Sequence, residues 1–330
     1  MYLMRKAFQS IIPICITLLA LPAFGQMIDN TVSYRTINSD RYFRIHYEND
    51  YFSKTDFYYT QGINLEFVHP LLGKAITSKI LIRSRQKQMK FGISSEHLGY
   101  TPTSISHPEI LVGDRPFAAS IFLKNFAIMN DSMRQERWVS SFNLGVIGPW
   151  AGGEEMQAAI HRWINDRVPM GWEHQIHNDA VINYQVDYEK SFTPQWKYFS
   201  VHGKTGGRVG TFSDKVYGGA VIMAGLYDNP FTNFSSPSKN FRIYTYFEPQ
   251  LSVVGYDATL QGGLFNRNSP YTISSADISR VVFQYNTGLV IKVRGMYMEY
   301  FQSFLTKEFA TGGTHHWGGV RLSWSFHKKD

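Results

Sequence analysis

The chain has 330 residues, of which 15% are aromatic and 18% charged, and its formal net charge is +7. A positive charge this mild and this dispersed does not argue for a nucleic-acid partner. The only cysteine is Cys15, so the rest of the chain offers no disulfide, thiol nucleophile or cysteine metal site.

The first 25 residues have the order of a secretory signal. Arg5 and Lys6 precede an apolar run over residues 11–21, and Ala23-Phe24-Gly25 forms a small-residue cleavage site. The run is too short for a transmembrane helix, which needs roughly 20 apolar residues. We therefore expect cleavage before Gln26, with loss of two cations to give a net charge of +5, and one mature domain over residues 26–330.

Alternating hydrophobicity is the main structural signal of the mature chain. Val320, Leu322, Trp324 and Phe326 alternate with polar residues, and residues 63–67 and 180–188 repeat the pattern. This period places the apolar side chains on one face of a strand. With 20 Tyr, 24 Phe and 7 Trp, the chain resembles outer-membrane barrels, whose strands face lipid on one side and carry aromatic girdles. A soluble β-sandwich is the alternative, although its strands are usually shorter.

The expected fold class is therefore all-β, a transmembrane antiparallel β-barrel of about 12 strands in the bacterial outer membrane. An even number of strands is the rule for such barrels, and each run is long enough to cross the bilayer. The expected strands lie near residues 41–49, 60–69, 88–99, 118–128, 136–147, 179–191, 197–211, 215–226, 241–256, 279–291, 294–306 and 315–326.

Loop lengths indicate the orientation. An even strand number puts both termini in the periplasm, so connections after odd-numbered strands face outward. The long outward connections are residues 50–59, 100–117, 148–178 and 257–278. The inward connection over residues 70–87 breaks this rule because it is long and basic, and it could include a periplasmic helix.

One outward loop is expected to contain an amphipathic helix over residues 152–167. Met156, Ile160, Trp163 and Ile164 recur at helical spacing after two glycines and an acidic first turn. Such a helix can lie in the lipid interface, where Trp163 and Trp172 would suit the headgroup zone.

The same helix carries a candidate general base. Gln157 and His161 are four residues apart, so their side chains project from one face. Histidine suits general-base chemistry near neutral pH. The alternative is a solvated or capping histidine.

The rim of the first expected hairpin is rich in oxygen atoms. Glu48-Asn49-Asp50 ends the first strand, and Asp56 and Thr60 follow at the start of the second. Carboxylate and amide oxygens are ligands that Ca²⁺ prefers, whereas the alternative is a solvated hairpin end. The sequence has no EF-hand, phosphate-binding glycine loop or His-x-x-x-His zinc pair.

Arg115 lies in Gly113-Asp114-Arg115-Pro116-Phe117, at the start of the fourth expected strand. It could pair with Asp114 or a neighbouring carboxylate as a structural clamp. It could instead hold a ligand phosphate through its planar guanidinium group.

Several separated motifs, in this order, resemble the lipid A 3′-O-deacylase family of outer-membrane barrels. The motifs cover about the first half of the mature chain. They are Glu48-Asn49-Asp50, Tyr59-Thr60-Gln61-Gly62, Tyr100-Thr101-Pro102, Gly113 to Phe117, Leu144 to Pro149, Gly152-Gly153-Glu154, Gln157, His161, and Gly171-Trp172 to Gln175.

The resemblance implies calcium-dependent hydrolysis of an ester-linked acyl chain of lipid A or lipopolysaccharide, at a site between the barrel wall and a loop helix. His161 matches the family's general base. Asn49, Thr60 and Gln157 match residues around the catalytic centre, and Asp50 with Asn49 would bind Ca²⁺. The family also uses a lysine where this chain has none between Lys90 and Lys124.

His107 is the positional counterpart of that lysine, and the candidate substrate-binding residues are Arg115, His107 and Trp172. In the expected reaction His161 takes a proton from water, which attacks the ester, while calcium stabilises the oxyanion. The expected partners are lipid A and outer-membrane lipid, and the expected oligomeric state is a monomer.

Three alternatives remain from the sequence: a pore, a non-catalytic binding barrel, and a phospholipase with a strand-borne serine and histidine. A pore predicts charge on the inward strand faces around an open lumen. Ser140 and Ser141 show no recognisable phospholipase motif.

Overall fold

The computed structural model describes residues 27–53, 57–193, 197–234 and 240–326. The expected signal peptide over residues 1–25 lies outside the described residues, as do the last four residues of the chain. Among the described residues, no helix is long and apolar enough to cross a membrane.

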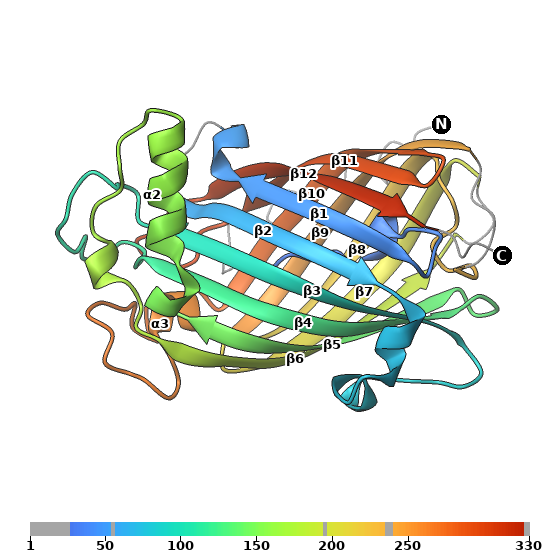
Figure 1. Ribbon diagram of the computed structural model, residues 1–330, viewed down its shortest axis with the longest axis horizontal. Helices are drawn as coiled ribbons and strands as arrows, with labels where there is room; N and C mark the ends of the chain where they lie inside the picture. Colours follow the sequence, from blue (N-terminus) through green and yellow to red (C-terminus); the bar gives the residue numbers. More distant parts are fainter. Residues whose placement is uncertain (1–26, 54–56, 194–196, 235–239, 327–330) are drawn as a thin grey trace, which may run out of the picture.

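Twelve antiparallel strands of the described chain close into a barrel in which each strand pairs with its sequence neighbours and β1 pairs with β12 (Figure 1). The expected all-β barrel is therefore confirmed. The strands are β1 Tyr42–Asn49, β2 Tyr58–Val68, β3 Gln88–Thr101, β4 Ala118–Asp131, β5 Glu136–Ile147, β6 Asp179–Ser191, β7 Phe199–Gly210, β8 Ser213–Leu226, β9 Phe241–Asp257, β10 Val281–Val293, β11 Met296–Leu305 and β12 His315–Ser325.

The two ends of the barrel differ. Tyr42 at the start of β1 lies opposite Ser325 at the end of β12, and we call this the inner end. The opposite, outer end carries α2 (Gly153–Trp163) and α3 (Ala258–Gln261), as Figure 1 shows. The connections that were expected to face outward all lie at this outer end, whereas the long connection over residues 70–87 lies at the inner end, as expected.

Short 3₁₀ turns complete the described elements. The long inward connection contains two of them rather than an α-helix. The 3₁₀ turns of the described chain are η2 Ser33–Arg35, η3 Asp50–Ser53, η4 Pro70–Lys74, η5 Thr77–Ile80, η6 Pro149–Ala151 and η7 Trp172–His174, and η4 and η5 are the two in the long inward connection.

Burial follows the alternation of the sequence. On β12, Leu322 and Trp324 are exposed while Arg321 and Ser323 are buried; on β2, Leu65 is exposed and Asn64 buried. Because a strand directs successive side chains to opposite faces, the exposed apolar set forms the outer wall and the polar set fills the interior.

The interior is crossed by the segment that precedes β1. This N-terminal segment, residues 27–40, has no exposed residue. Strand side chains hydrogen-bond its backbone from different sides of the barrel: Arg44 donates to Asn30 O (2.7 Å), Arg137 to Thr31 O (2.6 Å) and Lys292 to Thr36 O (2.8 Å). The segment therefore fills the lumen as a plug.

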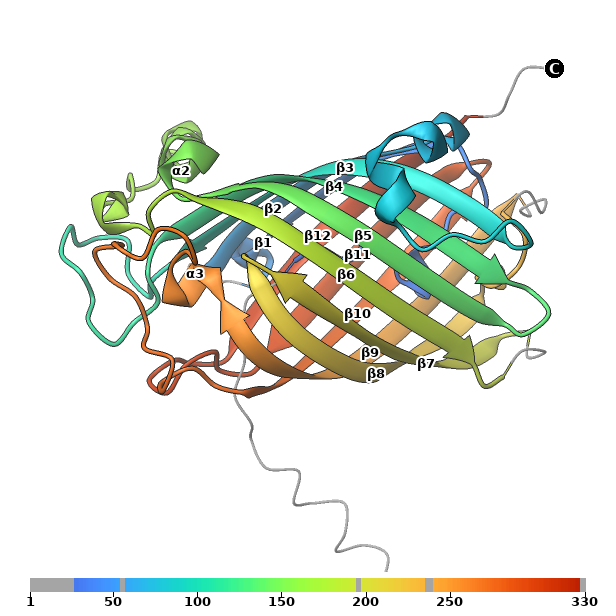
Figure 2. The ribbon, with the colours of Figure 1, turned by 90° about the horizontal axis from the view of Figure 1, so that it is seen from below.

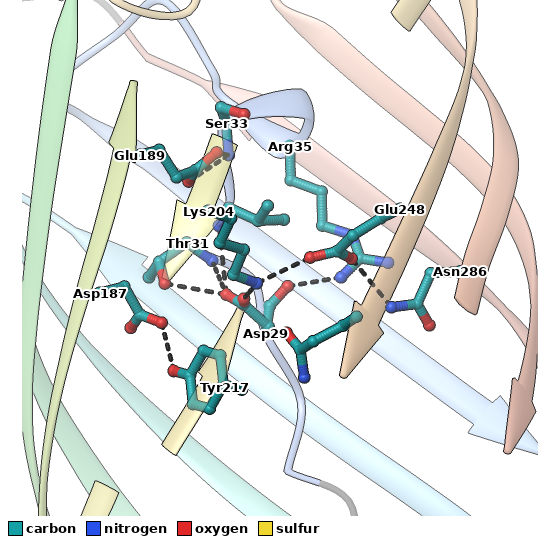
Figure 3. Close-up of polar contacts among 12 residues, drawn as sticks. Asp29, Thr31, Ser33, Arg35, Asp187, Glu189, Lys204, Tyr217, Glu248 and Asn286 are labelled. Carbon is teal, nitrogen blue, oxygen red and sulfur yellow. Dashed lines mark hydrogen bonds and ion pairs between the residues drawn. The ribbon is translucent and has the colours of Figure 1, made fainter. Parts of the chain in front are cut away.

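Ion pairs fix the N-terminal segment to the wall (Figure 3). Lys204 on β7 lies 2.7 Å from both Asp29 and Glu248. Arg35 lies 3.0 Å from Glu299 on β11, and the segment backbone also donates from Ser33 to Glu189. Charge does line the lumen, as the pore alternative predicts, but several of these charged side chains bind the plug, and others pair with one another across the wall.

Candidate functional site

The first hairpin rim is held together by the oxygen-rich motif. Asn49 is the last residue of β1; its Nδ2 donates to Thr60 O across the hairpin (2.6 Å), and its Oδ1 accepts from Tyr51 N (2.7 Å). The buried carboxylate of Asp50 accepts from Phe57 N (2.7 Å). The motif therefore fixes the shape of its own loop.

Thr60 lies at an irregularity in the pairing of β2 with β3. Tyr59 faces Tyr100 and Gln61 faces Gly99, so Thr60 is an extra residue between these pairs. A bulge of this kind shifts the alternation of the strand. As a result Thr60 lines the same cavity as Asn49, although simple alternation along the two strands places them on different faces.

Glycines and a small buried cluster position α2 across the outer ends of β2 to β4 (Figure 1). Gly152 has φ +71° and begins the turn into the helix, which favours glycine. A Cβ on Gly153 would lie 2.3 Å from Ala119 Cβ and 2.8 Å from the Trp172 ring, so only glycine allows this approach. Trp172 packs on Phe117 beneath the helix.

The helix ends earlier than expected, at Trp163 rather than Arg167. Asn165 adopts a left-handed conformation with φ +55°, which stops the helix and turns the chain back. The return brings Arg167 O to 2.7 Å from His161 Nδ1. This early stop therefore supplies the histidine with its partner.

The hydrogen bond to Arg167 determines the tautomer of His161. A carbonyl oxygen only accepts, so Nδ1 carries the proton and donates it. In the neutral ring Nε2 is then the nitrogen with the free lone pair, as a general base requires. Arg167 is itself held by a 2.6 Å bond to Ser106 Oγ.

A cavity of about 540 Å³ separates this helix from the first hairpin. It brings together four of the expected site residues, Asn49, Asp50, Thr60 and His161. The remaining lining residues are Tyr47, Tyr51, Phe52, Ile160, Trp163, Ile164, Asn165 and Asp166.

The apolar part of this lining was not expected as part of the site. Trp163 is 84% exposed and Tyr51 80% exposed, and Ile164 is also exposed. Helical spacing identified Trp163 and Ile164 as an apolar face, but not as a cavity wall. The polar face with Gln157 and His161 is the buried one, whereas Trp163 and Ile164 are exposed and line the cavity.

A polar network inside the lumen lies next to the rim residues Asn49 and Thr60. Glu48 accepts from Tyr59 Oη and lies 2.8 Å from His46 Nε2. All three residues are buried. The alternation of β1 could have indicated that Glu48 points inward, but not its partners.

Other expected site residues do not line this cavity. Gln157 is buried and accepts from Trp172 Nε1 (2.8 Å), so both side chains support the helix from below. His107 is exposed in the loop between β3 and β4. Arg115 is buried elsewhere at the outer end.

Arg115 forms a clamp between outer loops. Its guanidinium group pairs with Glu308 and donates to Thr259 Oγ1 (2.6 Å), and it lies 4.3 Å from the centre of the Tyr100 ring. Burial raises the pKa of Glu308, and Arg115 opposes this shift. These contacts match the structural alternative considered for Arg115.

Arg115→Ala is therefore expected to lower the unfolding free energy by about 3–5 kcal/mol, because Glu308 is left buried without its cation. The cavity around His161 should stay unchanged, because Arg115 does not line it. Urea unfolding in detergent micelles, with exposed Arg267→Ala as control, measures the first effect. Weaker binding of a phosphate-bearing ligand at unchanged stability would instead assign Arg115 to ligand binding.

The rim also has the donor chemistry of a hard-cation site. The Asp50 carboxylate, the Asn49 amide oxygen and the Asp166 carboxylate all belong to cavity residues. Such an all-oxygen set fits Ca²⁺ in kind. Within the described residues no three His, Cys, Asp or Glu side chains cluster as a metal site. Water or substrate oxygens would therefore have to complete the coordination.

The fold and this site define a class: an outer-membrane β-barrel with a cavity between its outer rim and a loop helix. The sequence matches the family of outer membrane protein LpxR over residues 12–326. The chain belongs to that family, which confirms the resemblance to the lipid A deacylases.

The fold agrees with that of a solved structure from this family. LpxR from Salmonella typhimurium is 19% identical with a TM-score of 0.71, and the match covers 86% of this chain and all of that one. The β domain of the Bordetella autotransporter BrkA is 7% identical with a TM-score of 0.44, covering 87% of this chain and 99% of that one. No curated protein sequence matches the chain.

Proposed function

We propose that this protein hydrolyses one ester-linked acyl chain of lipid A in the outer leaflet, with His161 as the general base. The observation that carries the proposal is the position of His161: its Nδ1 is bound by the Arg167 carbonyl, and its ring lines a cavity at the outer end of the barrel. Membership of the LpxR family supports the choice of substrate.

The cavity suits a lipid with a polar head. Its outer side is apolar, with exposed Trp163, Ile164 and Tyr51, whereas its inner side carries the oxygen atoms of Asn49 and Asp50. An acyl chain can follow the apolar side while the ester meets the polar side. Aromatic side chains such as Trp163 are favoured at the interface between lipid and water.

The reaction is hydrolysis of the acyl ester by attack of water on its acyl carbon. His161 Nε2 takes a proton from water as the water oxygen bonds to the acyl carbon. The ester C–O bond then breaks, and the sugar oxygen receives the proton held by His161. The products are a free fatty acid and a lipid A with one more hydroxyl, and no covalent enzyme intermediate is needed.

Ca²⁺, held by Asp50 and Asn49, would stabilise negative charge on the ester carbonyl oxygen. The chain itself contributes the fixed orientation of both ligands through the bonds to Tyr51, Thr60 and Phe57. Removing one electrostatic stabiliser of an oxyanion typically lowers the rate by about 100- to 1,000-fold.

Chelation of Ca²⁺ is therefore expected to lower the deacylation rate by about 100- to 1,000-fold, and Asp50→Asn should do the same at low calcium. Rates of purified protein in micelles, titrated with CaCl₂ after chelation, measure both effects. Asp277→Asn removes an exposed outer-loop carboxylate outside the cavity and serves as control. Full activity of the wild type in chelator would rule out the calcium requirement.

The proposed function is tested by mass spectrometry of lipid A from cells that express the protein, compared with an empty vector. The expected product has lost one ester-linked acyl chain. In H₂¹⁸O the released fatty acid should carry one ¹⁸O atom, which distinguishes hydrolysis from transfer to another lipid. Unchanged lipid A, despite a folded barrel in the membrane, would favour a pore or a binding barrel.

The phospholipase alternative gains no support from the structure. Ser140 accepts a hydrogen bond from Ile82 N (2.9 Å), in the connection at the inner end. It therefore lies at the opposite end of the barrel from the cavity with His161.

A further inference from the structure

The connection between β2 and β3 folds back onto the outside of the barrel. We call residues 70–87 the basic loop; Figure 2 shows it against the outer surface near the inner end. Its backbone and side chains bond to wall residues on three strands. These contacts are Ser78 Oγ with Asn125 Oδ1 (3.2 Å), Ile82 N with Ser140 Oγ (2.9 Å), and Tyr184 Oη with Ile80 O (2.9 Å).

The wall residues contacted by the loop belong to the lipid-facing set. Asn125, Ser140 and Tyr184 alternate in step with the exposed residues Leu123, Leu144 and Ile182 on β4, β5 and β6. Leu72 and Leu81 of the loop pack on the same face, against Phe91 and Ala127. The loop is therefore placed where the wall meets lipid, not over the opening of the lumen.

The basic loop combines cations with exposed apolar side chains. It contains no acidic residue, and its cations are Lys74, Lys79, Arg83, Arg85 and Lys87. Of these, Lys87 pairs with Asp131 at 2.9 Å. Leu71 is 61% exposed and Ile76 81% exposed. Exposed apolar groups beside uncompensated cations suit the boundary between acyl chains and anionic headgroups.

A groove of about 470 Å³ lies where the loop returns to β3. It is lined by Arg83, Ser84, Arg85, Met89 and Phe91. The Arg83 guanidinium lies 4.9 Å from the centre of the Phe91 ring and donates to Gly73 O at 3.0 Å, so its position is fixed. The groove therefore combines two arginines with the apolar side chains of Met89 and Phe91.

We propose that this groove binds an anionic glycerophospholipid of the inner leaflet. Arg83 and Arg85 bind the phosphate, because the planar guanidinium group matches phosphate oxygens. An acyl chain lies along Met89 and Phe91. An acidic protein would satisfy the charges but not the exposed Leu71 and Ile76 on the lipid-facing wall. The site is independent of the proposed deacylation, since it lies at the other end of the barrel.

The test is native mass spectrometry of the full-length barrel in detergent, titrated with phosphatidylglycerol and, separately, with phosphatidylethanolamine. Wild type is expected to bind phosphatidylglycerol more tightly. Arg83→Gln/Arg85→Gln should weaken phosphatidylglycerol binding by about 10- to 30-fold, since each cation near an anionic headgroup contributes about fivefold and the variant removes two. Arg83→Lys/Arg85→Lys should retain the preference for the anionic lipid.

The matched control removes two exposed cations from other inner-end turns, Lys197→Gln with Arg294→Asn. Unchanged phosphatidylglycerol binding in this control, with loss in the arginine pair, supports the site. Equal loss in both pairs, or no loss in the arginine pair, overturns it. Deacylation measured on the same samples should be equal in all variants, so a failure of the catalytic proposal is recognised separately.

Discussion

His161→Ala is expected to reduce lipid A deacylation by about 100- to 10,000-fold while the barrel stays folded, since this is the usual contribution of a general base. The ring contacts the Arg167 carbonyl at the end of a surface helix, so its loss leaves the strand pairing untouched. The measurement is the rate of fatty-acid release from lipid A micelles, with heat-modifiable migration on gels as the folding check.

The matched control is His316→Ala, which removes an exposed histidine at the same end of the barrel but outside the cavity. It should keep wild-type activity. The loss in His161→Ala should appear in kcat with little change in KM, because a general base acts in the transition state. Activity of His161→Ala within a few-fold of wild type would remove the histidine from the mechanism, and unchanged lipid binding would then favour a binding barrel.

Deletion of residues 27–40 is expected to convert a non-conducting barrel into an ion-permeable one. The N-terminal segment occupies the lumen and accepts hydrogen bonds from Arg44, Arg137 and Lys292 on different strands. Without it these cations would face water. Single-channel recording in planar bilayers measures the effect, with the full-length protein expected to show no stable conductance. Steady conductance of the full-length barrel would revive the pore alternative.

The plug should also stabilise the barrel, and Arg35→Ala isolates this effect in the full-length chain. Arg35 and Glu299 are both buried and lie 3.0 Å apart, and Glu299 also keeps a second cation, Arg321, at 3.0 Å, so removing Arg35 should cost about 1.5–3 kcal/mol. Arg41→Ala is the control, because Arg41 is only partly buried and its pair with Asp40 is 3.8 Å long, which predicts about 0–1 kcal/mol. Equal unfolding midpoints for the two variants would show that the plug contributes no stability.

The position of the strands could be predicted from the sequence because a barrel in lipid imposes one rule on every strand. Lipid-facing positions are mostly apolar, apart from polar residues such as Asn125 and Ser140 that contact the basic loop, and interior positions can be polar, so the period of two persists along the chain. The expected strand over residues 179–191 is β6 with the same bounds, and residues 136–147 are β5. The end of the barrel at which each loop lies followed from the even number of strands.

The candidate site was predicted in part. Local motifs identified Asn49, Asp50, Thr60 and His161, which the cavity brings together. Trp172 and Gln157 belong to the same motifs, but they hold the helix in place instead of lining the cavity. A motif records which residues occur together, and it does not distinguish a residue that lines a site from one that supports it.

What the sequence determined by itself was the periodic part of this protein: the strands, their faces, the orientation of the loops and the helix with His161. What only the tertiary structure decided depends on partners far apart in the chain. The sequence of the plug has no hydrophobic periodicity. Its residue Arg35 pairs with Glu299, which lies 264 positions further along the chain. Arg115 meets Glu308, and the bulge at Thr60 turns that residue toward the cavity. Alternation is a local consequence of strand geometry, whereas these contacts exist only after the barrel has closed and brought distant strands around one interior.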